Sequence, residues 1–514
     1  MREANIFKSV ILISSMVLMF KVIGFVKQAI IAYYYGATTE MDLYFIAYGF
    51  IISLSEALVK ALSVSMISVY TMVRINEGRD KAQILVSTLL ELFMLIAIVC
   101  TICFFLFAPQ LSAMLLMHST STNIAQLSFF IRALSAMCIF IVIELVGTSV
   151  LDSERQYYVP RTQSLIYSIS VISACILFSS CYRIGALIGA LYSSSLIYSV
   201  LVWCFVKKYV VYFKFVRINL NDIYIKQILW LSLPLLIGNS AIQINQIVDR
   251  TIASNLADGA VSALSYCHTV AQLVTNVLIV NVSNVLFAHF NNLVINNQNN
   301  EVKDTLAKTL SLIFCILAPI MIITVMCAED IIRILFYRGK FSDNAVNLTS
   351  IALLGYAISF PFVGIRDILT KSMYAYQNTR RPMITSLISI VCNIILSITL
   401  SKWLGILGIT IGASIAIAIG TGLNLYAFKK VCPTFSYHDL LITIIKGIPA
   451  MLLCFISVYV YKKILISCSL IVDFMIITCI VFLIFEGVML LEKEKYVLNF
   501  VKHIITPCKK NSEH

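Results

Sequence analysis

The chain has 514 residues, of which 60% are hydrophobic and 12% are charged, and its formal net charge is +13. Soluble domains carry roughly one quarter charged residues, so this composition excludes an ordinary soluble protein and indicates that a bilayer surrounds most of the chain. The basic residues lie in short clusters between apolar runs, a spacing typical of cytoplasmic loops and not of a surface that binds nucleic acid.

About fourteen apolar runs are long enough to cross a bilayer, which takes about 20 residues per helix. We therefore predict an all-α polytopic membrane protein. The runs, in chain order, are 9–35, 41–72, 83–107, 124–150, 159–180, 184–206, 228–252, 261–289, 305–327, 344–375, 383–401, 406–428, 441–461 and 468–491. The second and tenth exceed the length of a simple span, which predicts tilting or kinking there. The first continues to Tyr35 without a cleavage site, so we expect a retained helix and not a signal peptide.

The distribution of basic residues predicts the orientation in the membrane. If the N-terminus is cytoplasmic, about 23 lysines and arginines fall in inner segments and about seven in outer ones. This bias predicts that both termini and the loop 207–227 are cytoplasmic and that segment 328–343 is outside. Fifteen cysteines are scattered through apolar runs, and the C-x-x-C of Cys100 and Cys103 lacks a second pair. We therefore predict neither a metal site nor a cofactor.

Short matches recur along the chain at a spacing of about 222 residues. The matching pairs are 26–30 with 248–252, Pro160 with Pro382, and Lys207-Lys208 with Lys429-Lys430. Because each repeat holds an even number of helices, the two halves should be related by a pseudo-twofold axis along the membrane normal. The predicted domains are an N-lobe at 1–210 (helices 1–6), a C-lobe at 211–432 (helices 7–12), and helices 13 and 14 with a basic cytoplasmic tail at 433–514.

Charged residues inside the predicted spans are the first candidates for a binding site. A charged side chain at the bilayer centre costs about 2.5–3.5 kcal/mol, so it usually faces a cavity or a partner. Lys21 and Lys27 are six positions apart, about 120° around a helix, and both can border one wide cavity. Glu56 and Lys60 are spaced i, i+4 on the second helix, which fits either an internal ion pair or a direct contact with substrate.

The seventh and eighth predicted helices are unusually polar, as expected for helices that line a water-filled cavity. Asn245 contributes to this polarity. Asp249 and Arg250 are adjacent and point about 100° apart, so they cannot simply neutralise each other. They fit a gate or an inter-lobe contact, and equally an anchor at the membrane interface. His268 fits a hydrogen-bonded core residue better than a titrating site.

Several stretches in combination resemble one family of membrane proteins. They are 21–27 (KVIGFVK), 32–37 (AYYYGA), 42–45 (DLYF), 243–250 (QINQIVDR), 262–266 (SALSY), 335–341 (LFYRGKF), 374–375 (YA) and 379–382 (TRRP). Together they resemble the lipid II flippases called MurJ or MviN, of the multidrug/oligosaccharidyl-lipid/polysaccharide exporter superfamily. The resemblance implies fourteen helices in two lobes around a V-shaped cationic cavity, with helices 13 and 14 forming a lipid-facing groove.

The resemblance also implies the activity and the site. The implied substrate is an undecaprenyl-pyrophosphate-linked saccharide, with lipid II in first place. It is moved from the inner to the outer leaflet of the bacterial cytoplasmic membrane by alternating access, in the service of peptidoglycan synthesis and cell shape. The expected substrate-binding residues are Lys21, Lys27, Asp42, Glu56, Lys60, Asn245, Asp249, Arg250 and His268.

The sequence departs from the family pattern at the cavity. The family's arginines on helix 1 are lysines here, which offer point charges in place of bidentate forks. Its arginine pair on helix 2 and its Asp-Arg pair on helix 8 fall at Ser55-Glu56 and His268-Thr269. The cavity is therefore less cationic than the family pattern. Some members hold sodium between helices 7, 11 and 12, but here Ser397 stands where a carboxylate is wanted, so no metal site is predicted.

Other functions stay open beside this one. A flippase for another lipid-linked oligosaccharide, such as a capsule, O-antigen or exopolysaccharide unit, would share the architecture. An ion-coupled drug exporter would need a buried carboxylate such as Glu144 or Glu91, although the lysines of the first helix disfavour cationic drugs. An enzyme would need a carboxylate cluster or a large extramembrane loop, and neither is visible. We expect a monomeric transporter whose partners are the lipid-linked saccharide and membrane lipids, with no nucleic acid.

Overall fold

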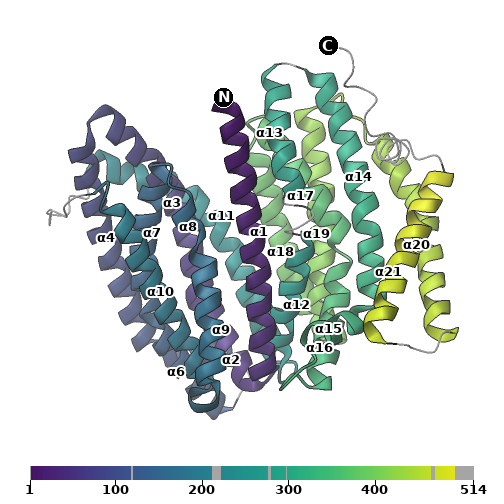
Figure 1. The fold of residues 1–514 in the computed structure, drawn as a ribbon, viewed down its shortest axis with the longest axis horizontal. Coiled ribbons are helices and arrows are strands. Elements are labelled where there is room, and N and C mark those ends of the chain that lie inside the picture. The colour runs from purple at the N-terminus through teal and green to yellow at the C-terminus, as the bar shows by residue number, and fades with distance from the viewer. Residues whose placement is uncertain are drawn as a thin grey trace. The chain divides into compact units, whose positions relative to one another are not determined.

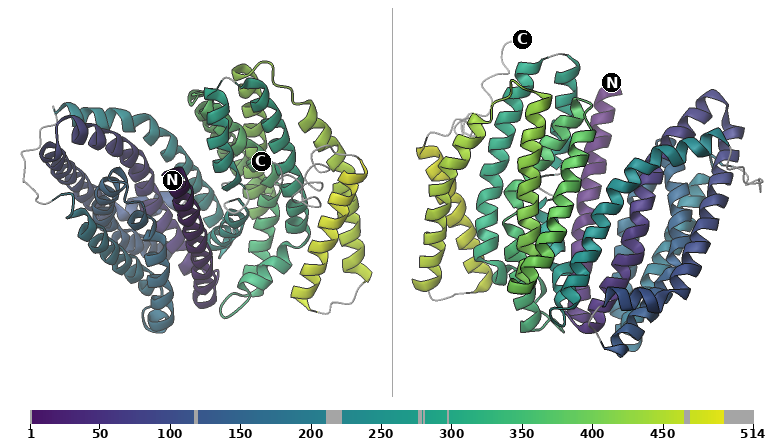
Figure 2. Two further views of the ribbon diagram at one scale, coloured as in Figure 1. Left: turned by 45° about the horizontal axis from the view of Figure 1, so that its top comes forward. Right: turned by 180° about the vertical axis from the view of Figure 1, so that it is seen from behind.

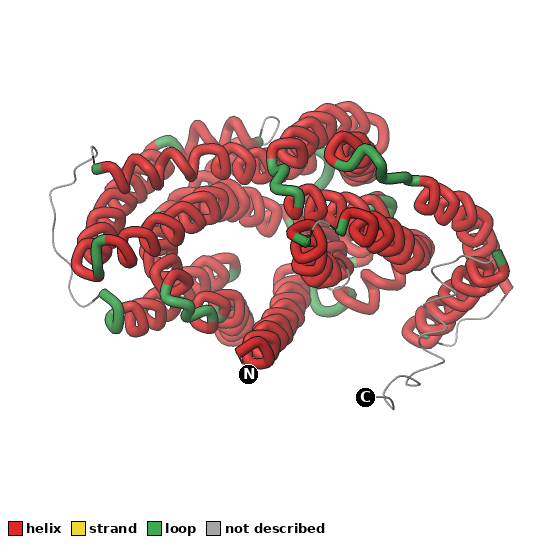
Figure 3. The backbone as a smooth tube through the Cα atoms, turned by 90° about the horizontal axis from the view of Figure 1, so that it is seen from above, coloured by secondary structure: helices red, strands yellow, loops and turns green. Residues whose placement is uncertain are grey.

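The computed structural model describes residues 2–116, 120–210, 222–275, 279, 281–296, 298–464 and 469–492. Every regular element in these ranges is a helix, as Figures 1 and 3 show. The elements are α1 (Arg2–Tyr35), α2 (Thr39–Tyr48), the π-helical η1 (Gly49–Ser53), α3 (Leu54–Asn76), α4 (Arg79–Leu106), α5 (Ala108–Leu115), α6 (Ser121–Ser135), α7 (Met137–Ser153), α8 (Tyr158–Arg161), α9 (Gln163–Tyr182), α10 (Ile184–Val206), α11 (Ile223–Ser254), α12 (Ala260–Val274), α13 (Asn281–Ile295), α14 (Asn299–Met326), α15 (Ala328–Phe336), α16 (Asp343–Ala357), α17 (Phe360–Ala375), α18 (Arg380–Leu404), α19 (Ile406–Val431), α20 (His438–Ile464) and α21 (Leu470–Leu491).

The structure confirms the prediction of an all-helical protein with many membrane-spanning helices. Within the described ranges, 11 helices are long and apolar enough to cross a membrane, and the bent pair α16–α17 raises the number to 12. The fourteen spans expected from the sequence stay a prediction. The run expected at 261–289 also stays a prediction. α12 ends at Val274 and α13 begins at Asn281, residues 275 and 279 between them are π-helical, and residues 276–278 and 280 lie outside the described ranges.

Two long spans are irregular where the sequence predicts kinking. The axes of α16 and α17 differ by 47° across a short break, and Pro361 occupies the first turn of α17. Proline has no N–H and cannot continue the hydrogen-bond ladder of a preceding helix, so it starts a new helix in a new direction. The span Thr39–Asn76 is continuous but contains the π-helical turn η1, a feature often found at functional sites.

The chain divides into two compact units. The first comprises Met1–Tyr266 and Arg338–Ala345, and the second comprises Cys267–Tyr337 and Val346–His514. In the first unit, α3, α4, α7, α10 and α11 enclose an apolar core that includes Met66, Val86 and Tyr198. The lobe boundaries expected at residues 210 and 432 stay predictions.

The second unit has two main apolar cores. One lies among α13, α14, α17 and α19, around Phe290, Leu310 and Leu369. The other joins α14 to the C-terminal pair α20–α21 through Ile322 and Phe485, and both views of Figure 2 show this yellow-green pair beside α14. α14 therefore packs against both cores, with a different set of its side chains in each.

Candidate functional site: a cavity in the first unit

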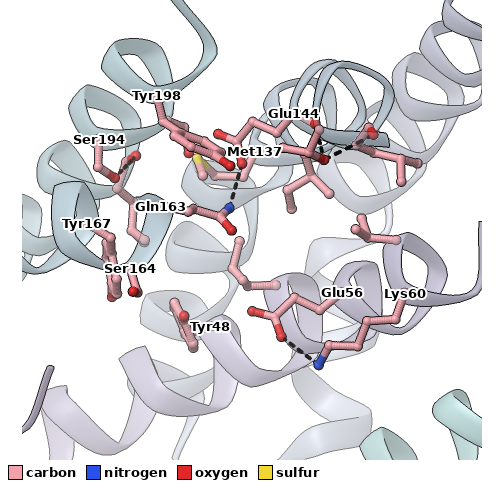
Figure 4. Close-up of a pocket in the computed structure, with 17 residues that line it drawn as sticks. Tyr48, Glu56, Lys60, Met137, Glu144, Gln163, Ser164, Tyr167, Ser194 and Tyr198 are labelled. Atoms are coloured by element: carbon pink, nitrogen blue, oxygen red, sulfur yellow. Dashed lines mark hydrogen bonds and ion pairs between the residues drawn. The ribbon is translucent and has the colours of Figure 1, made fainter. Parts of the chain in front are cut away.

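A cavity of about 420 Å³ lies inside the first unit. Its walls come from α2, η1, α3, α7, α9 and α10, and Figure 4 shows the side chains that line it. Pockets that enclose small-molecule groups have volumes of about 300–1,000 Å³. The cavity therefore has the size and the mixed polar and apolar lining of a binding pocket.

One side of the cavity carries an ion pair from α3. Lys60 Nζ lies 3.4 Å from Glu56 Oε2, and the two side chains are 59% and 50% exposed. An exposed i, i+4 pair contributes only about 0.3–0.5 kcal/mol, so Lys60 can exchange this partner for a stronger anion at little cost. The structure thus contains the ion pair that the spacing predicts, and places it at the cavity.

The facing side carries a buried carboxylate from α7. Glu144 is 5% exposed, and Gln163 Nε2 on α9 donates a 2.8 Å hydrogen bond to its Oε2. Its Oε1 has no partner within ordinary hydrogen-bond distance, and the Ser195 hydroxyl on α10 is the nearby donor of the cavity lining. The sequence indicates Glu144 only as the buried carboxylate of a drug exporter and gives no signal for Gln163, because the residues that surround these two come from distant helices.

Lys27 contacts a residue that lines the same cavity. Its Nζ is 4.2 Å from the ring centroid of Tyr167 on α9, and Tyr167 lines the cavity together with Lys60. A cation over an aromatic face contributes about 0.5–2 kcal/mol. Lys21, two turns earlier on α1, is partly exposed and forms no ion pair with another described residue. Glu56 and Lys60 therefore line this cavity, whereas Lys27 contacts its lining through Tyr167.

Asp42 anchors the beginning of α12. Its Oδ2 accepts a 2.7 Å hydrogen bond from the Gly259 N–H, and its Oδ1 accepts one of 2.7 Å from the Ser262 N–H and one of 2.5 Å from the Ser262 hydroxyl. A carboxylate at a helix N-terminus satisfies the free N–H groups and complements the helix dipole. These bonds support a structural role for Asp42, and its contact with substrate stays a prediction.

Glycines allow the loops around Asp42 to approach closely. Gly259 has φ +85°, and a Cβ there would lie 2.6 Å from the Ala37 carbonyl oxygen. Gly339 has φ +61°, and its Cβ would overlap the Tyr33 carbonyl oxygen, whose hydrogen bond from the Lys340 N–H is 2.9 Å long. These positions need a residue without a Cβ in the left-handed region.

Arg250 joins α11 to α2 within the first unit. Its Nη1 donates a 3.3 Å hydrogen bond to the Phe45 carbonyl, and the guanidinium occupies the space that a Cβ at Gly49 would need. On the same helix, Asn245 Nδ2 donates to Asp249 Oδ2 at 3.4 Å. The π-helical turn begins at this Gly49, so the arginine and the irregular turn form one contact.

His268 belongs to the second unit and is not part of the cavity. Its ring centroid lies 6.2 Å from that of Tyr356 on α16. In the same unit, Lys371 Nζ pairs with Asp367 at 3.3 Å and donates a 2.7 Å bond to Ser283 Oγ. These contacts form a small polar network between α17 and α13. In the described part of the chain, no three His, Cys, Asp or Glu side chains are grouped to hold a metal.

Comparison with known proteins identifies relatives over most of the chain. The family model described as "Lipid II flippase MurJ" matches residues 31–481. A probable lipid II flippase MurJ of Buchnera aphidicola subsp. Baizongia pistaciae is 23% identical over 486 residues, which are 90% of this chain and 91% of that protein. One from Helicobacter pylori strain 26695 is 29% identical over 220 residues, 43% of this chain and 46% of that protein.

Solved structures share the fold. A lipid II flippase MurJ in an inward closed conformation superposes with a TM-score of 0.81 at 23% identity, covering 96% of this chain and all of that one. An inward-facing multidrug resistance MATE family transporter of the MOP superfamily gives 0.69 at 14% identity, covering 83% of this chain and 99% of that one.

Proposed function

The chain belongs to the MurJ lipid II flippase family, and from this membership we propose that it moves lipid II from the inner to the outer leaflet of the bacterial cytoplasmic membrane. The headgroup crosses through the protein by alternating access between an N-lobe and a C-lobe, while the polyprenyl chain stays in the bilayer. The protein is a monomer with cytoplasmic termini and acts as a transporter, not as an enzyme.

The observation that supports this site is one lysine that lines the cavity and a second lysine that contacts the cavity lining. Lys27 lies on the ring of Tyr167, and Lys60 lines the same cavity in a weak, exposed ion pair. Ammonium groups form strong charge-assisted hydrogen bonds with phosphate oxygens. We propose that Lys27 and Lys60, with Lys21 six residues before Lys27 on α1, hold the diphosphate of the substrate.

The membrane potential drives export in this proposal, without a tightly bound metal cation. Moving one elementary charge across 100 mV changes the free energy by about 2.3 kcal/mol. An anionic headgroup that leaves an inside-negative cytoplasm moves down this gradient. Flipping that continues unchanged after complete depolarisation, yet stops when sodium is removed, would contradict the mechanism.

A flippase for another lipid-linked saccharide is the second candidate. Glu56 stands where the resemblance expects a cavity arginine. Its carboxylate pairs with Lys60 and so offsets one positive charge of the cavity. A cavity with fewer fixed cations suits a headgroup whose recognition depends more on its sugars and less on its phosphates. A repeat unit of a surface polysaccharide has such a headgroup.

Complementation separates these two functions. A strain depleted of its own lipid II flippase should regain growth and normal shape when this protein is expressed at normal levels. Purified protein in liposomes should then flip fluorescent lipid II at a rate that falls on depolarisation. Growth that is not rescued, together with flipping of a surface-polysaccharide precursor but not of lipid II, would favour the second candidate.

A further inference from the structure

The unpaired oxygen of Glu144 is the most unusual polar atom of the cavity. Buried polar atoms in folded proteins almost always have a hydrogen-bond partner, and an unpaired one destabilises the fold. Oε1 of Glu144 has no partner at ordinary hydrogen-bond distance, with the Ser195 hydroxyl nearby, whereas Gln163 satisfies Oε2 of the same carboxylate. Because Glu144 lines the cavity, a donor group of a molecule held there can complete the pairing.

The charges of the cavity show which part of a substrate belongs on each side. Figure 4 shows the Glu56–Lys60 pair on one side and Glu144 with Gln163 on the facing side. A diphosphate carries only acceptors and negative charge, so a carboxylate repels it and lysines attract it. A saccharide carries O–H and amide N–H donors, which a carboxylate oxygen and a carboxamide oxygen accept.

The aromatic lining suits a sugar ring as well. Tyr48 of α2 and Tyr167 of α9 border the cavity between the two sides. A tyrosine offers an apolar ring face together with a polar hydroxyl, so it can pack against the C–H face of a sugar. The ring of Tyr167 also supports Lys27 at 4.2 Å. A phosphate bound at Lys27 is therefore separated from the interior of the cavity by the side chain of Tyr167.

We propose that the Glu144–Gln163 side of this cavity is the subsite for the sugar attached directly to the diphosphate. Glu144 Oε1 accepts a hydrogen bond from a hydroxyl or an acetamido N–H of that sugar, and Gln163 orients the carboxylate through Oε2. The inference rests on the proposed function and adds a recognition element on α7 and α9. It makes the protein selective for glycosylated over bare polyprenyl diphosphate.

The test compares two lipids on the same full-length protein. Dissociation constants are measured by native mass spectrometry for undecaprenyl diphosphate and for undecaprenyl diphosphate that carries one N-acetylhexosamine. Wild-type protein should bind the glycosylated lipid more tightly. Glu144→Leu should weaken that binding about ten- to hundredfold, the range for a lost hydrogen bond to a charged group, and should leave binding of the bare lipid within about twofold.

Two further variants keep the test decisive. Glu144→Gln has the same shape and retains an acceptor, so it should lose about fivefold for the glycosylated lipid only. If Glu144→Leu fails to fold, the dissociation constants of Glu144→Gln alone test the proposed subsite. Glu91→Gln on α4 removes a span carboxylate outside the cavity lining and should change neither constant.

The outcomes distinguish this inference from the proposed function. Wild-type protein that binds neither lipid overturns both. Wild-type protein that binds both lipids, with Glu144→Gln affecting them equally or not at all, overturns only the sugar subsite. Binding of the glycosylated lipid that depends on sodium in wild type but not in Glu144→Gln would also overturn it, because Glu144 would then be a cation ligand.

Discussion

Replacing Lys27 by alanine should cripple flipping by weakening the hold on the substrate diphosphate. The ammonium of Lys27 lies 4.2 Å from the ring centroid of Tyr167 and forms no ion pair with another described residue. It is therefore available to an anion. One charge-assisted hydrogen bond contributes about 1.5–3 kcal/mol, so its loss should weaken binding about ten- to hundredfold.

The neighbouring ring supplies matched controls for Lys27. Lys27→Arg keeps the charge and stacks well on an aromatic face, so it should retain most of the activity. Tyr167→Phe keeps the ring and should be mild. Tyr167→Leu removes the cation–π contact, worth about 0.5–2 kcal/mol, and should weaken binding by a smaller factor than Lys27→Ala.

Binding and flipping should be measured together on these variants. The dissociation constant for lipid II comes from native mass spectrometry, and the initial flipping rate comes from fluorescent lipid II in liposomes with a fixed membrane potential. Wild-type affinity and wild-type rate in Lys27→Ala would refute the assignment of Lys27. Equal losses in Lys27→Ala and Lys27→Arg would show that shape, and not charge, matters at this position.

Three other outcomes follow from the same structure. Lys21→Ala should abolish or cripple flipping while Lys21→Arg retains it, and Lys446→Ala on α20, whose Nζ donates to the Glu492 carbonyl, should be mild; wild-type rates in Lys21→Ala would remove it from the site. Asp42→Ala leaves three donors unpaired at about 1 kcal/mol or more each, so the unfolding temperature in detergent should fall, and an unchanged temperature would contradict the anchoring role. A single cysteine in segment 328–343 of a cysteine-free protein should react with an impermeant thiol reagent from outside, whereas outside labelling at position 214, which lies beyond the described residues, would reverse the topology.

The helices were predictable because their signal is local. A span of about 20 apolar residues leaves few alternatives in a bilayer, and the excess length of the run 344–375 indicated the kink that Pro361 introduces. The eighth run, 261–289, stays a prediction, because residues 276–278 and 280 lie outside the described part of the chain.

The partners of the charged residues could not be predicted from spacing. Glu56 and Lys60 are one turn apart on one helix, so the i, i+4 rule finds their ion pair. Asp42 bonds to Ser262, 220 positions away, and no local pattern indicates that distance. Glu144 was visible as a span carboxylate, but its unpaired oxygen appears only when α9 and α10 close the cavity around it.

The contact between Tyr33 and Lys340 also sets an order of events during synthesis. The two residues share a backbone hydrogen bond in the first unit, yet about 300 residues separate them along the chain. At a translation rate of about 5–20 residues per second, Lys340 is synthesised about 15–60 s after Tyr33. The first unit is therefore completed only after residues 267–337 of the second have been made. A chain whose synthesis stops before residue 338 lacks the hydrogen bond between Tyr33 and Lys340.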